Sequence, residues 1–597
     1  MTKRVFMGAT LLLTGLVMVF QVAWALSLPG FRGPDEPHHV NSILRLASGG
    51  GWPVPGEAML DPAVVQAGRE SGIIVGQADS FVGMSRTRLE NSGVEQRSEP
   101  PLYTFFAERE VVPEGERSAI GPVEMADPEA VEIDQMSQHP PVYYAGGAAL
   151  VSVFDLEEQP WDRMLTVLRL YGILLTAPVV PALVYMARRL GVRRTWALAA
   201  GFLPFAIPQY FAITGGVTND SMAIGTGALV VAALAKAGTE PISRKTVLLA
   251  GGSLGLALWS KGLLLALGLA LVLVFMLKRD ESWRRRIVAT GTSGVLALAI
   301  GWWWILNVVR YGVIQPSGFH RAPGAEWDPA LAEPAGFLSS ALRSIATSFF
   351  SSFGWLEAKF PSDLTFLLSG ALIVAVIWGV IAAGKHRRTA VAILSPVGGL
   401  VLVLLAESWS TYVETGMIAG VQGRYLFPMI AALSVIILGL QSRRGITLVI
   451  FAAITVIVGA YGYVYFLESL YPGEDTRIDL ERFSEVTGIS SRTTTVLMTG
   501  VVIVLVAALV LAAIVARIES RLDLSKDEAK VRPLLGEGLF RPRRETTPGS
   551  DEADSNTPVG VGVEASEVQK GPALNGDAKP RHASTGDAVH DSSVEGR

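Results

Sequence analysis

Long uninterrupted apolar segments are the feature that most constrains how this chain can fold. A helix needs about 20 mostly apolar residues to cross the hydrocarbon core of a bilayer, so these segments predict about twelve membrane spans. Only 17% of the 597 residues are charged, and the mean hydropathy of +0.40 excludes an ordinary soluble domain. The sequence therefore predicts an all-α polytopic membrane protein. The expected spans are 5–27, 165–187, 195–213, 221–237, 246–259, 262–277, 287–309, 364–383, 389–407, 424–440, 446–467 and 494–517.

Two of the expected spans are short, 246–259 and 262–277. Together they are too long for one crossing helix, and each alone is barely long enough. Trp259-Ser260-Lys261-Gly262 marks the break between them, because glycine and the polar neighbours interrupt a helix. The first segment, 5–27, has the charged start of a signal peptide but no clean small-residue cleavage site, so we expect it to remain as a helix.

Basic residues in the short connections predict the orientation. Pairs and clusters of lysine and arginine lie at Lys3-Arg4, Arg188-Arg189 with Arg193-Arg194, Lys278–Arg286, Lys385–Arg388 and Arg443-Arg444. Cytoplasmic loops are enriched in such residues, so we expect both termini in the cytoplasm of a cell that carries the chain in its cytoplasmic membrane.

The same rule decides the short apolar segment 142–154. If this segment crossed the membrane, Arg188-Arg189 would lie outside, so we interpret it as an interfacial helix on the outer surface. The transmembrane domain is then 1–517, with two large outer loops at 28–141 and 310–363. Residues 518–597 are rich in Ser, Gly, Pro and acids, which predicts a disordered cytoplasmic tail.

An acidic motif follows the first span directly. Asp35-Glu36-Pro37-His38-His39 places two carboxyl groups and two imidazoles where the chain leaves the bilayer. Ionisable groups at such a boundary favour a functional site, whereas a solvated loop with a proline turn is the alternative. A carboxylate could act as a general base, or Asp35 and Asp220 could hold a divalent cation. Adjacent side chains rarely point the same way, which favours divided roles for the two acids.

Two further segments carry candidate residues at outer boundaries. His139 precedes two prolines and Tyr143, where a helix start could favour a phosphate or where His139 could simply end the loop. Asn219-Asp220 begins the span 221–237, so Asp220 is either a helix cap or a second acid facing the cavity of Asp35. Adjacent His38 and His39 lack the helical spacing of zinc ligands, which makes a zinc site the weaker alternative.

Cations at the outer boundary point to an anionic ligand. Lys261 lies between two spans, and Arg424-Tyr425 begins another. Both cations are costly to bury, and a lipid phosphate would supply a counter-charge. There is no cysteine, and no nucleotide-binding loop is present, so ATP-driven chemistry is not expected. Nothing in the sequence indicates a nucleic-acid partner.

These motifs together resemble the GT-C superfamily of integral-membrane glycosyltransferases. Within it, the chain is most similar to a family of bacterial predicted membrane proteins of unknown function. The resemblance covers about residues 5–467 and rests on Pro34–His39, His139–Tyr144, Thr218–Asp220, Phe353–Leu356 and Gln422–Pro428.

The resemblance implies transfer of a sugar from a polyprenyl-phosphate carrier to a cell-envelope glycan, lipid or protein, on the outer face of the membrane. Residues expected to be catalytic are Asp35, Glu36 and Asp220. Residues expected to bind substrate are His38, His39, His139, Tyr143, Asn219, Lys261, Arg424 and Tyr425. The first outer loop is longer and more acidic than in many relatives, so acceptor recognition does not carry over. A divalent cation is a possible cofactor, and a secondary transporter or flippase of envelope precursors is the main alternative.

Overall fold

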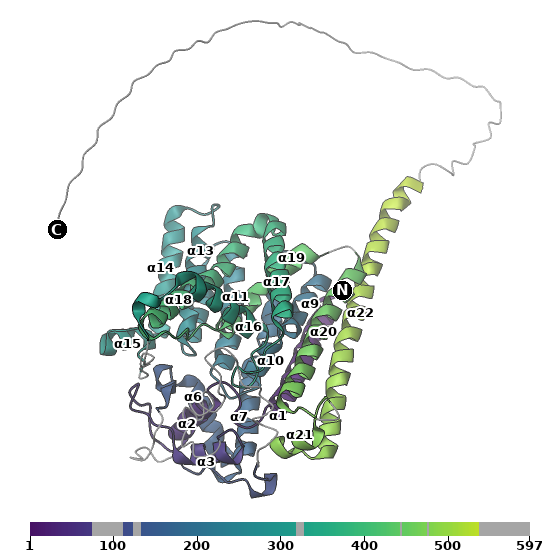
Figure 1. Cartoon of the computed structure of the whole chain (residues 1–597). Helices are drawn as coiled ribbons and strands as arrows, with labels where there is room; N and C mark the ends of the chain where they lie inside the picture. Colours follow the sequence, from purple (N-terminus) through teal and green to yellow (C-terminus); the bar gives the residue numbers. More distant parts are fainter. Residues whose placement is uncertain (75–110, 123–132, 318–326, 442–443, 474–476, 536–597) are drawn as a thin grey trace, which may run out of the picture. The chain divides into compact units, whose positions relative to one another are not determined.

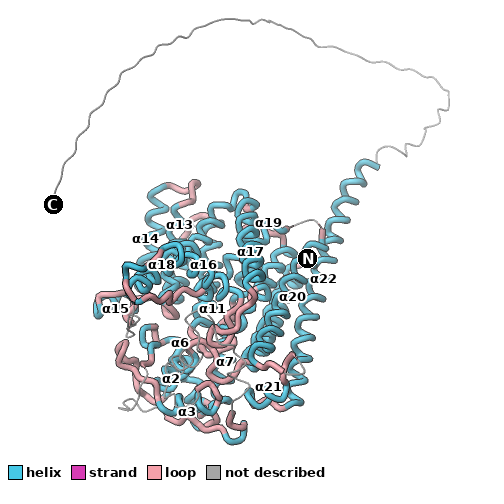
Figure 2. The backbone as a smooth tube through the Cα atoms, viewed as in Figure 1, coloured by secondary structure: helices cyan, strands magenta, loops and turns pink. Residues whose placement is uncertain are grey.

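The protein is described by a computed structural model that covers 1–74, 111–122, 133–317, 327–441, 444–473 and 477–535. Met1–Val531 forms one compact unit. Within the described ranges every regular element is a helix, and only three isolated β-bridges occur. The tube in Figure 2 contains helices and loops alone. The predicted all-α architecture is therefore confirmed.

Eight helical segments in the described part of the chain are long and apolar enough to cross a membrane. Each coincides with a predicted span. They are α1 (Lys3–Ser27), α7 (Trp161–Leu175) with α8 (Val179–Arg189), α11 (Asp220–Thr239), α17 (Ser362–Ala382), η7 (Gly384–His386) with α18 (Arg387–Thr415), η8 (Gly423–Val435) with α19 (Ile436–Leu440), α20 (Gly445–Leu470) and α22 (Ser491–Leu535).

Two more predicted spans are sharply bent. The first joins α9 (Arg194–Ala199) and η4 (Ala200–Ala206) to α10 (Pro208–Thr214) at 70°. Pro208 stands in the first turn of α10, where it lacks the N–H that a continuous helix would need. The second joins α14 (Trp283–Ile300) to α15 (Trp303–Tyr311) at 71°. Counting each bent pair as one span gives ten.

The expected count of about twelve spans is therefore not met among the described residues, and the difference is the pair of short segments. They form α12 (Arg244–Ala257), which has 14 residues, and η5 (Gly262–Ala266) with α13 (Leu267–Met276). The break at Trp259–Gly262 leaves each helix too short to count as a span. The predicted interfacial segment 142–154 is a helix, α6 (Val142–Val153).

The last helix extends past the predicted start of the tail. α22 continues to Leu535, whereas the sequence predicts disorder from 518. One reason is that Glu519 is buried, pairs with Arg193 at 2.6 Å and accepts a hydrogen bond from Thr195. The predicted disorder of 536–597 and the candidate lipid contacts of that tail lie outside the described residues.

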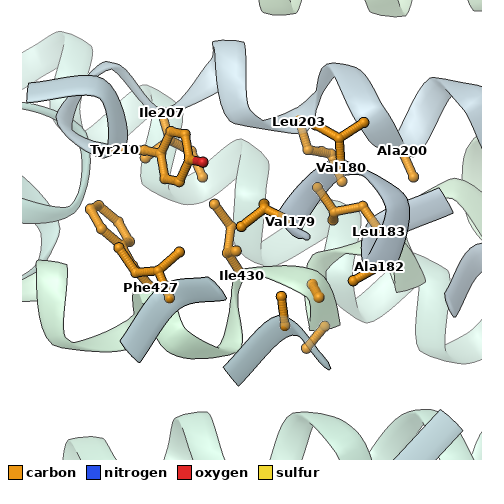
Figure 3. Close-up of a cluster of buried hydrophobic side chains, with 14 of the residues drawn as sticks. Val179, Val180, Ala182, Leu183, Ala200, Leu203, Ile207, Tyr210, Phe427 and Ile430 are labelled. Carbon is orange, nitrogen blue, oxygen red and sulfur yellow. The ribbon is translucent and has the colours of Figure 1, made fainter. Parts of the chain in front are cut away.

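The centre of the transmembrane unit is an apolar cluster between α8, η4, α10 and η8. Val179, Val180 and Leu183 of α8 face Leu203 and Ile430 of the neighbouring helices (Figure 3). These side chains are at most 4% exposed. The cluster fixes η8 relative to α8, and η8 carries Arg424 at its start.

Close packing of α11 against η8 depends on a glycine. A Cβ atom added at Gly227 would run into the carbonyl oxygen of Pro428. We expect Gly227→Ala to force the two helices apart and to cost about 1–3 kcal/mol, measured as a lower melting temperature of the purified protein. Gly252→Ala in α12 is the matched control, because nothing lies within 4 Å of its added Cβ. Equal melting temperatures for the two variants would contradict this packing.

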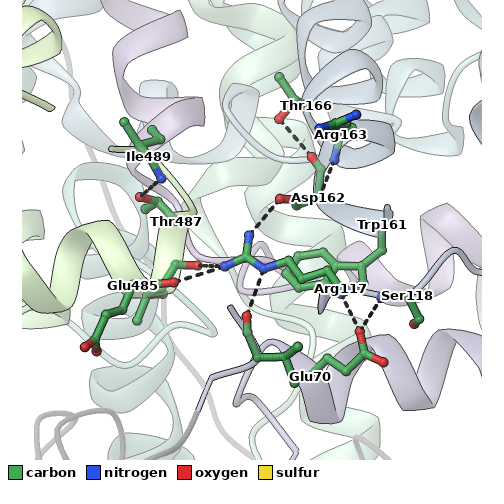
Figure 4. A network of polar contacts seen from close by, with 12 residues as sticks. Glu70, Arg117, Ser118, Trp161, Asp162, Arg163, Thr166, Glu485, Thr487 and Ile489 are labelled. Atoms are coloured by element: carbon green, nitrogen blue, oxygen red, sulfur yellow. Dashed lines mark hydrogen bonds and ion pairs between the residues drawn. The ribbon is translucent and has the colours of Figure 1, made fainter. Parts of the chain in front are cut away.

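The described parts of the loop 28–141, which is predicted to lie on the outer side, pack on the ends of the spans. They form α2 (Glu36–Ala47), α3 (Pro62–Glu70), η1 (Glu114–Glu116) and η2 (Gln135–Gln138), and α2 packs on α6 (Figure 1). Arg117 connects this loop to two helices (Figure 4). It donates hydrogen bonds to Asp162 at the start of α7 and to the carbonyl oxygens of Glu485 and Val486. The last two lie in α21 (Leu480–Thr487). The loop is thus a fixed cover over one end of the helices.

Candidate functional site

A cavity of about 610 Å³ lies where this cover meets the ends of the spans. Segments distant in the sequence contribute to its wall: the turn before α2, η2, the break at Lys261, the segment 353–358 and the start of η8. Seven of the eleven predicted site residues line it. They are Asp35, His38, His39, His139, Lys261, Arg424 and Tyr425.

Asp35 projects into this cavity from a strained turn. Its backbone has φ 59° and ψ 12°, a left-handed conformation that is costly for residues other than glycine and that is often retained at functional sites. Its side chain is 38% exposed, so one carboxylate edge remains accessible. Oδ2 lies 3.2 Å from Nη2 of Arg424, and Oδ1 accepts a hydrogen bond from Gln135 at 3.4 Å.

The charge partners of Asp35 keep it ionised. Burial would raise the pKa of its carboxyl group, but the neighbouring Arg424, His39 and His38 lower it more, so the pKa lies below its ordinary value. A base must be deprotonated to act, and Asp35 is so at neutral pH.

Glu36 does not reach the cavity, because it is buried in a separate ion pair. Its two carboxylate oxygens accept from Nε and Nη2 of Arg169, each at 2.8 Å, and it is 0% exposed. The backbone N–H groups of Gly33 and Val217 also donate to it. The two acids therefore have separate surroundings. Asp35 faces the cavity, whereas Glu36 is buried on the other side of the turn that carries Asp35 and stabilises that turn.

Arg169 completes that anchor. Besides Glu36, it donates to the backbone carbonyl oxygens of Ala25, Leu28 and Pro29, at 2.7–3.0 Å. One guanidinium thus ties the end of α1 to the start of α2, and the turn that carries Asp35 lies between them. Arg169 lies within the predicted span 165–187, where a buried charge is unusual.

Asp220 is paired rather than used as a cap. It is the first residue of α11, and Oδ1 accepts from Nζ of Lys261 at 2.7 Å. Asn219 occupies the N-cap position without a side-chain cap hydrogen bond, is 0% exposed, and has no hydrogen-bond partner for its amide among the described residues. Neither Asn219 nor Tyr143, which is also 0% exposed, lines the cavity.

Two cations and an aromatic ring form one corner of the cavity. Lys261 Nζ and the guanidinium carbon of Arg424 lie 5.5 Å and 5.4 Å from the ring centroid of Tyr425. Each cation is also bound to one carboxylate, of Asp220 and Asp35 respectively. The ring and the acids hold the two charges close together, which is suited to binding an anion with several oxygen atoms.

His39 and His139 add polar but uncharged groups to the cavity wall. His39 stacks on Tyr144, and its Nδ1 atom lies 3.0 Å from the hydroxyl group of that residue. Burial lowers the pKa of His39 to about 3, and the pKa of His139 lies well below its ordinary value because of burial and the nearby Lys261. Both rings are therefore neutral at physiological pH. His320, another histidine of the predicted outer surface, lies outside the described residues.

The donor set does not fit a metal ion. Among the described residues there is no group of three histidine, cysteine or acidic side chains that could hold one. The two candidate ligands, Asp35 and Asp220, are each ion-paired with a cation, so their charge is already compensated, although Oδ2 of Asp220 has no hydrogen-bond partner among the described residues. We derive no catalytic step through a metal.

In chemical terms, the corner pairs an accessible carboxylate with a cation cluster. It can bind an oxyanion at Lys261 and Arg424 and accept a proton at Asp35. Sequence reasoning identified all of these residues but not Gln135, Gln138 or Gln315, which also line the cavity. Trp355, another lining residue, entered only through the motif Phe353–Leu356 and without an assigned role. Single glutamines carry no sequence pattern that would have identified them.

Comparison with known proteins shows that the chain belongs to a family described as predicted membrane protein (DUF2142), whose model matches residues 18–433. This confirms the family-level resemblance. No curated protein matches. Similar solved structures include ArnT from Cupriavidus metallidurans bound to undecaprenyl phosphate, with 16% identity, coverage of 88% of this chain and 80% of that chain, and a TM-score of 0.40.

The oligosaccharyltransferase AglB from Archaeoglobus fulgidus, in complex with an inhibitory peptide and a dolichol-phosphate, is also similar. It has 12% identity and a TM-score of 0.28, with coverage of 81% of this chain and 56% of that chain.

Proposed function

We propose that this member of the DUF2142 family is a GT-C-type glycosyltransferase that moves a sugar from a polyprenyl-phosphate carrier to an acceptor hydroxyl group. One observation carries the proposal. Asp35, Lys261 and Arg424, from three distant segments, meet at one cavity at the ends of the spans, and a carboxylate base and two cations are the groups that this reaction needs.

The ion pair between Asp35 and Arg424 implies that the carrier binds before Asp35 accepts the proton. When the carrier phosphate binds to Arg424 it competes with Asp35 for the guanidinium. Asp35 then loses its strongest attractive partner, so its pKa rises and it becomes a better proton acceptor.

The transfer step then follows. The acceptor oxygen bonds to the anomeric carbon while the bond from that carbon to the phosphate oxygen breaks. The hydroxyl proton passes to Asp35, and the bonding electrons leave with the phosphate. Negative charge grows on the phosphate, where Lys261 and Arg424 stabilise it.

The positions of the charges favour an enzyme over a transporter. Asp220 and Arg424 are the first and second residues of their spans, whereas coupling residues of transporters lie near the middle of the bilayer. Among the described residues of α11 and η8, one other ion pair occurs, that of Lys236 with Glu240. It lies at the opposite end of α11 and not in the middle of the helix.

The expected orientation puts the cavity on the outer side. α11 has 20 residues, or about 30 Å of helix. Asp220 begins it at the cavity, and Glu240 follows its other end and pairs with Arg189 at 2.9 Å. Arg189 and Arg194, which donates to the carbonyl oxygen of Met1, belong to the basic connections that the positive-inside rule assigns to the cytoplasm. An envelope glycan, lipid or protein is then the natural acceptor.

The test is to measure carrier binding and sugar transfer in nanodiscs with labelled polyprenyl phosphate and polyprenyl-phosphate sugars. We expect Arg424→Gln to weaken carrier binding by about 10- to 100-fold, because a charge-assisted contact contributes about 1.5–3 kcal/mol. Arg477→Gln is the matched control, since Arg477 lies outside the cavity lining and its side chain is 86% exposed. Wild-type carrier affinity in Arg424→Gln would contradict the proposal.

A further inference from the structure

Away from the two cations, the cavity wall includes uncharged hydrogen-bonding groups and an aromatic ring beside apolar residues such as Leu263 and Leu404. Four glutamines and a tryptophan contribute: Gln135, Gln138, Gln315, Gln422 and Trp355. None of them has a role in the proposed phosphate binding or proton transfer. Gln135 borders Asp35 directly, because it donates to the carboxylate at 3.4 Å.

Trp355 is held in place by a rigid turn. Its Nε1–H group donates to the carbonyl oxygen of Phe31 at 2.9 Å, and Phe353 bridges to Ala358 across the turn. Within the turn, Leu356 adopts φ 67°, a left-handed conformation rare for a branched side chain. Such strain persists only where the surroundings fix the backbone, and it is often found at binding sites.

A buried ion pair anchors the same turn to the start of the acidic motif. Glu357 lies 2.6 Å from Arg32, and the two side chains are 7% and 1% exposed. The segment 353–358 is therefore fixed to the loop that leads into Asp35. The indole ring cannot move far without moving the base, which suits a wall that sets the position of a reacting group.

The glutamines keep hydrogen-bonding capacity toward the cavity. Each carboxamide has two donor hydrogens and an oxygen that accepts twice. Gln315 donates to the side-chain oxygen of Gln138 at 2.9 Å, which leaves the other atoms of both groups available. The side-chain oxygen of Gln422 is buried and has no partner among the described residues. Because a buried acceptor without a donor is costly, this oxygen indicates a ligand or water hydroxyl group.

We propose that the transferred group is an uncharged, polyhydroxylated sugar whose apolar face lies against Trp355 and whose hydroxyl groups bond to these glutamines. This inference rests on the proposed function. A sugar offers apolar C–H faces to an aromatic ring and hydroxyl groups to amides.

The charges of the cavity favour a neutral sugar over a charged one. Asp35, Lys261 and Arg424 are committed to each other, to Asp220 and to the carrier phosphate. The remaining charged lining residue is Glu407, whose side chain is exposed on α18. A carboxylate or ammonium group on the sugar would lose its hydration beside uncharged amides without gaining a counter-charge.

The experiment compares three donors with the same polyprenyl phosphate, which carry a neutral hexose, an amino sugar and a uronic acid. We expect the full-length protein in nanodiscs to bind and transfer the neutral donor at least about tenfold better than either charged donor. A preference for the amino sugar or the uronic acid would overturn the inference. The Glu407→Gln variant tests the one further charge among the described lining residues, and it is expected to leave the ranking unchanged.

Variants separate sugar recognition from carrier binding. Trp355→Leu and Gln422→Leu should each weaken binding of the sugar-bearing donor by about 3- to 10-fold, while binding of bare polyprenyl phosphate stays at the wild-type value and reports an intact fold. Trp302→Leu is the matched control, because its indole is 47% exposed away from the cavity lining.

The two proposals fail in different ways. If bare polyprenyl phosphate does not bind the wild-type protein, the proposed function is wrong and this inference falls with it. If the carrier binds but neither variant changes the affinity for the neutral donor, the sugar subsite alone is wrong.

Discussion

Asp35→Asn is expected to lower sugar transfer by about 10²- to 10⁴-fold, the usual contribution of a positioned general base. Asparagine keeps the size of the side chain and tolerates the left-handed turn that Asp35 occupies. It cannot accept the proton of the acceptor hydroxyl group. Binding of bare polyprenyl phosphate should be retained or strengthened, because Arg424 is released from its ion pair.

The pH dependence of the wild-type enzyme gives this prediction a second readout. The pKa of Asp35 lies below its ordinary value in the free protein: burial would raise it, but the attraction of Arg424 and the neighbouring histidines outweighs burial. Activity is lost as pH falls through the pKa of the base. Since the carrier phosphate would draw Arg424 away, the pKa that governs kcat should exceed the pKa that governs kcat/KM.

The control for this variant is Asp363→Asn, at the exposed start of α17 and outside the cavity lining. It should transfer sugar at the wild-type rate and keep the same pH profile. Full transfer by Asp35→Asn, or an unchanged acidic limb in its residual activity, would show that another group takes the proton.

The spans could be predicted from the sequence because the bilayer demands long apolar helices, and eight of them lie where hydropathy places them. Bends and short helices were harder to foresee. Hydropathy measures the length of an apolar segment but not the direction of its helix axis. The segment with the 70° bend at Ile207-Pro208 was therefore predicted as one continuous span. The break at Trp259–Gly262 and the shortness of its two flanking segments were foreseen, but both segments were still counted as spans.

The sequence was enough to name most residues of the candidate site, but not to predict which of them form ion pairs with each other. Asp35 and Arg424 are 389 positions apart, and no local pattern indicates that they touch. The resemblance placed Glu36 among the catalytic residues, but its side chain is bound to Arg169 and does not line the cavity. The expectation of divided roles for the two acids agrees with the geometry, whereas a shared catalytic role does not.

Removing Arg169 is expected to be among the most destabilising changes in the protein. Arg169→Ala would leave the carboxylate of Glu36 buried without a counter-charge, which typically costs about 3–5 kcal/mol. The carbonyl oxygens of Ala25, Leu28 and Pro29 would lose their donor as well. We expect a strongly reduced yield of folded protein and a much lower melting temperature. Arg477→Ala, in an exposed ion pair with Glu468, should change stability by less than about 1 kcal/mol.

Glu36→Gln decides between an anchoring and a catalytic role for this acid. Glutamine can still accept from Gly33 or Val217, but it leaves the guanidinium of Arg169 buried without its counter-charge. An anchor predicts that melting temperature, carrier binding and transfer all fall together, because the turn that carries Asp35 shifts. A second catalytic acid predicts lost transfer with unchanged stability.

The double variant Glu36→Leu with Arg169→Met sharpens the distinction. Removing both charges relieves the cost of an uncompensated buried ion, so stability should recover relative to Arg169→Ala. Recovery should be incomplete, since the three carbonyl oxygens at the end of α1 still lack a donor. If transfer recovers in step with stability, Glu36 acts only by holding Asp35 in place; if the double variant folds well, binds the carrier and still transfers nothing, the anchor account fails.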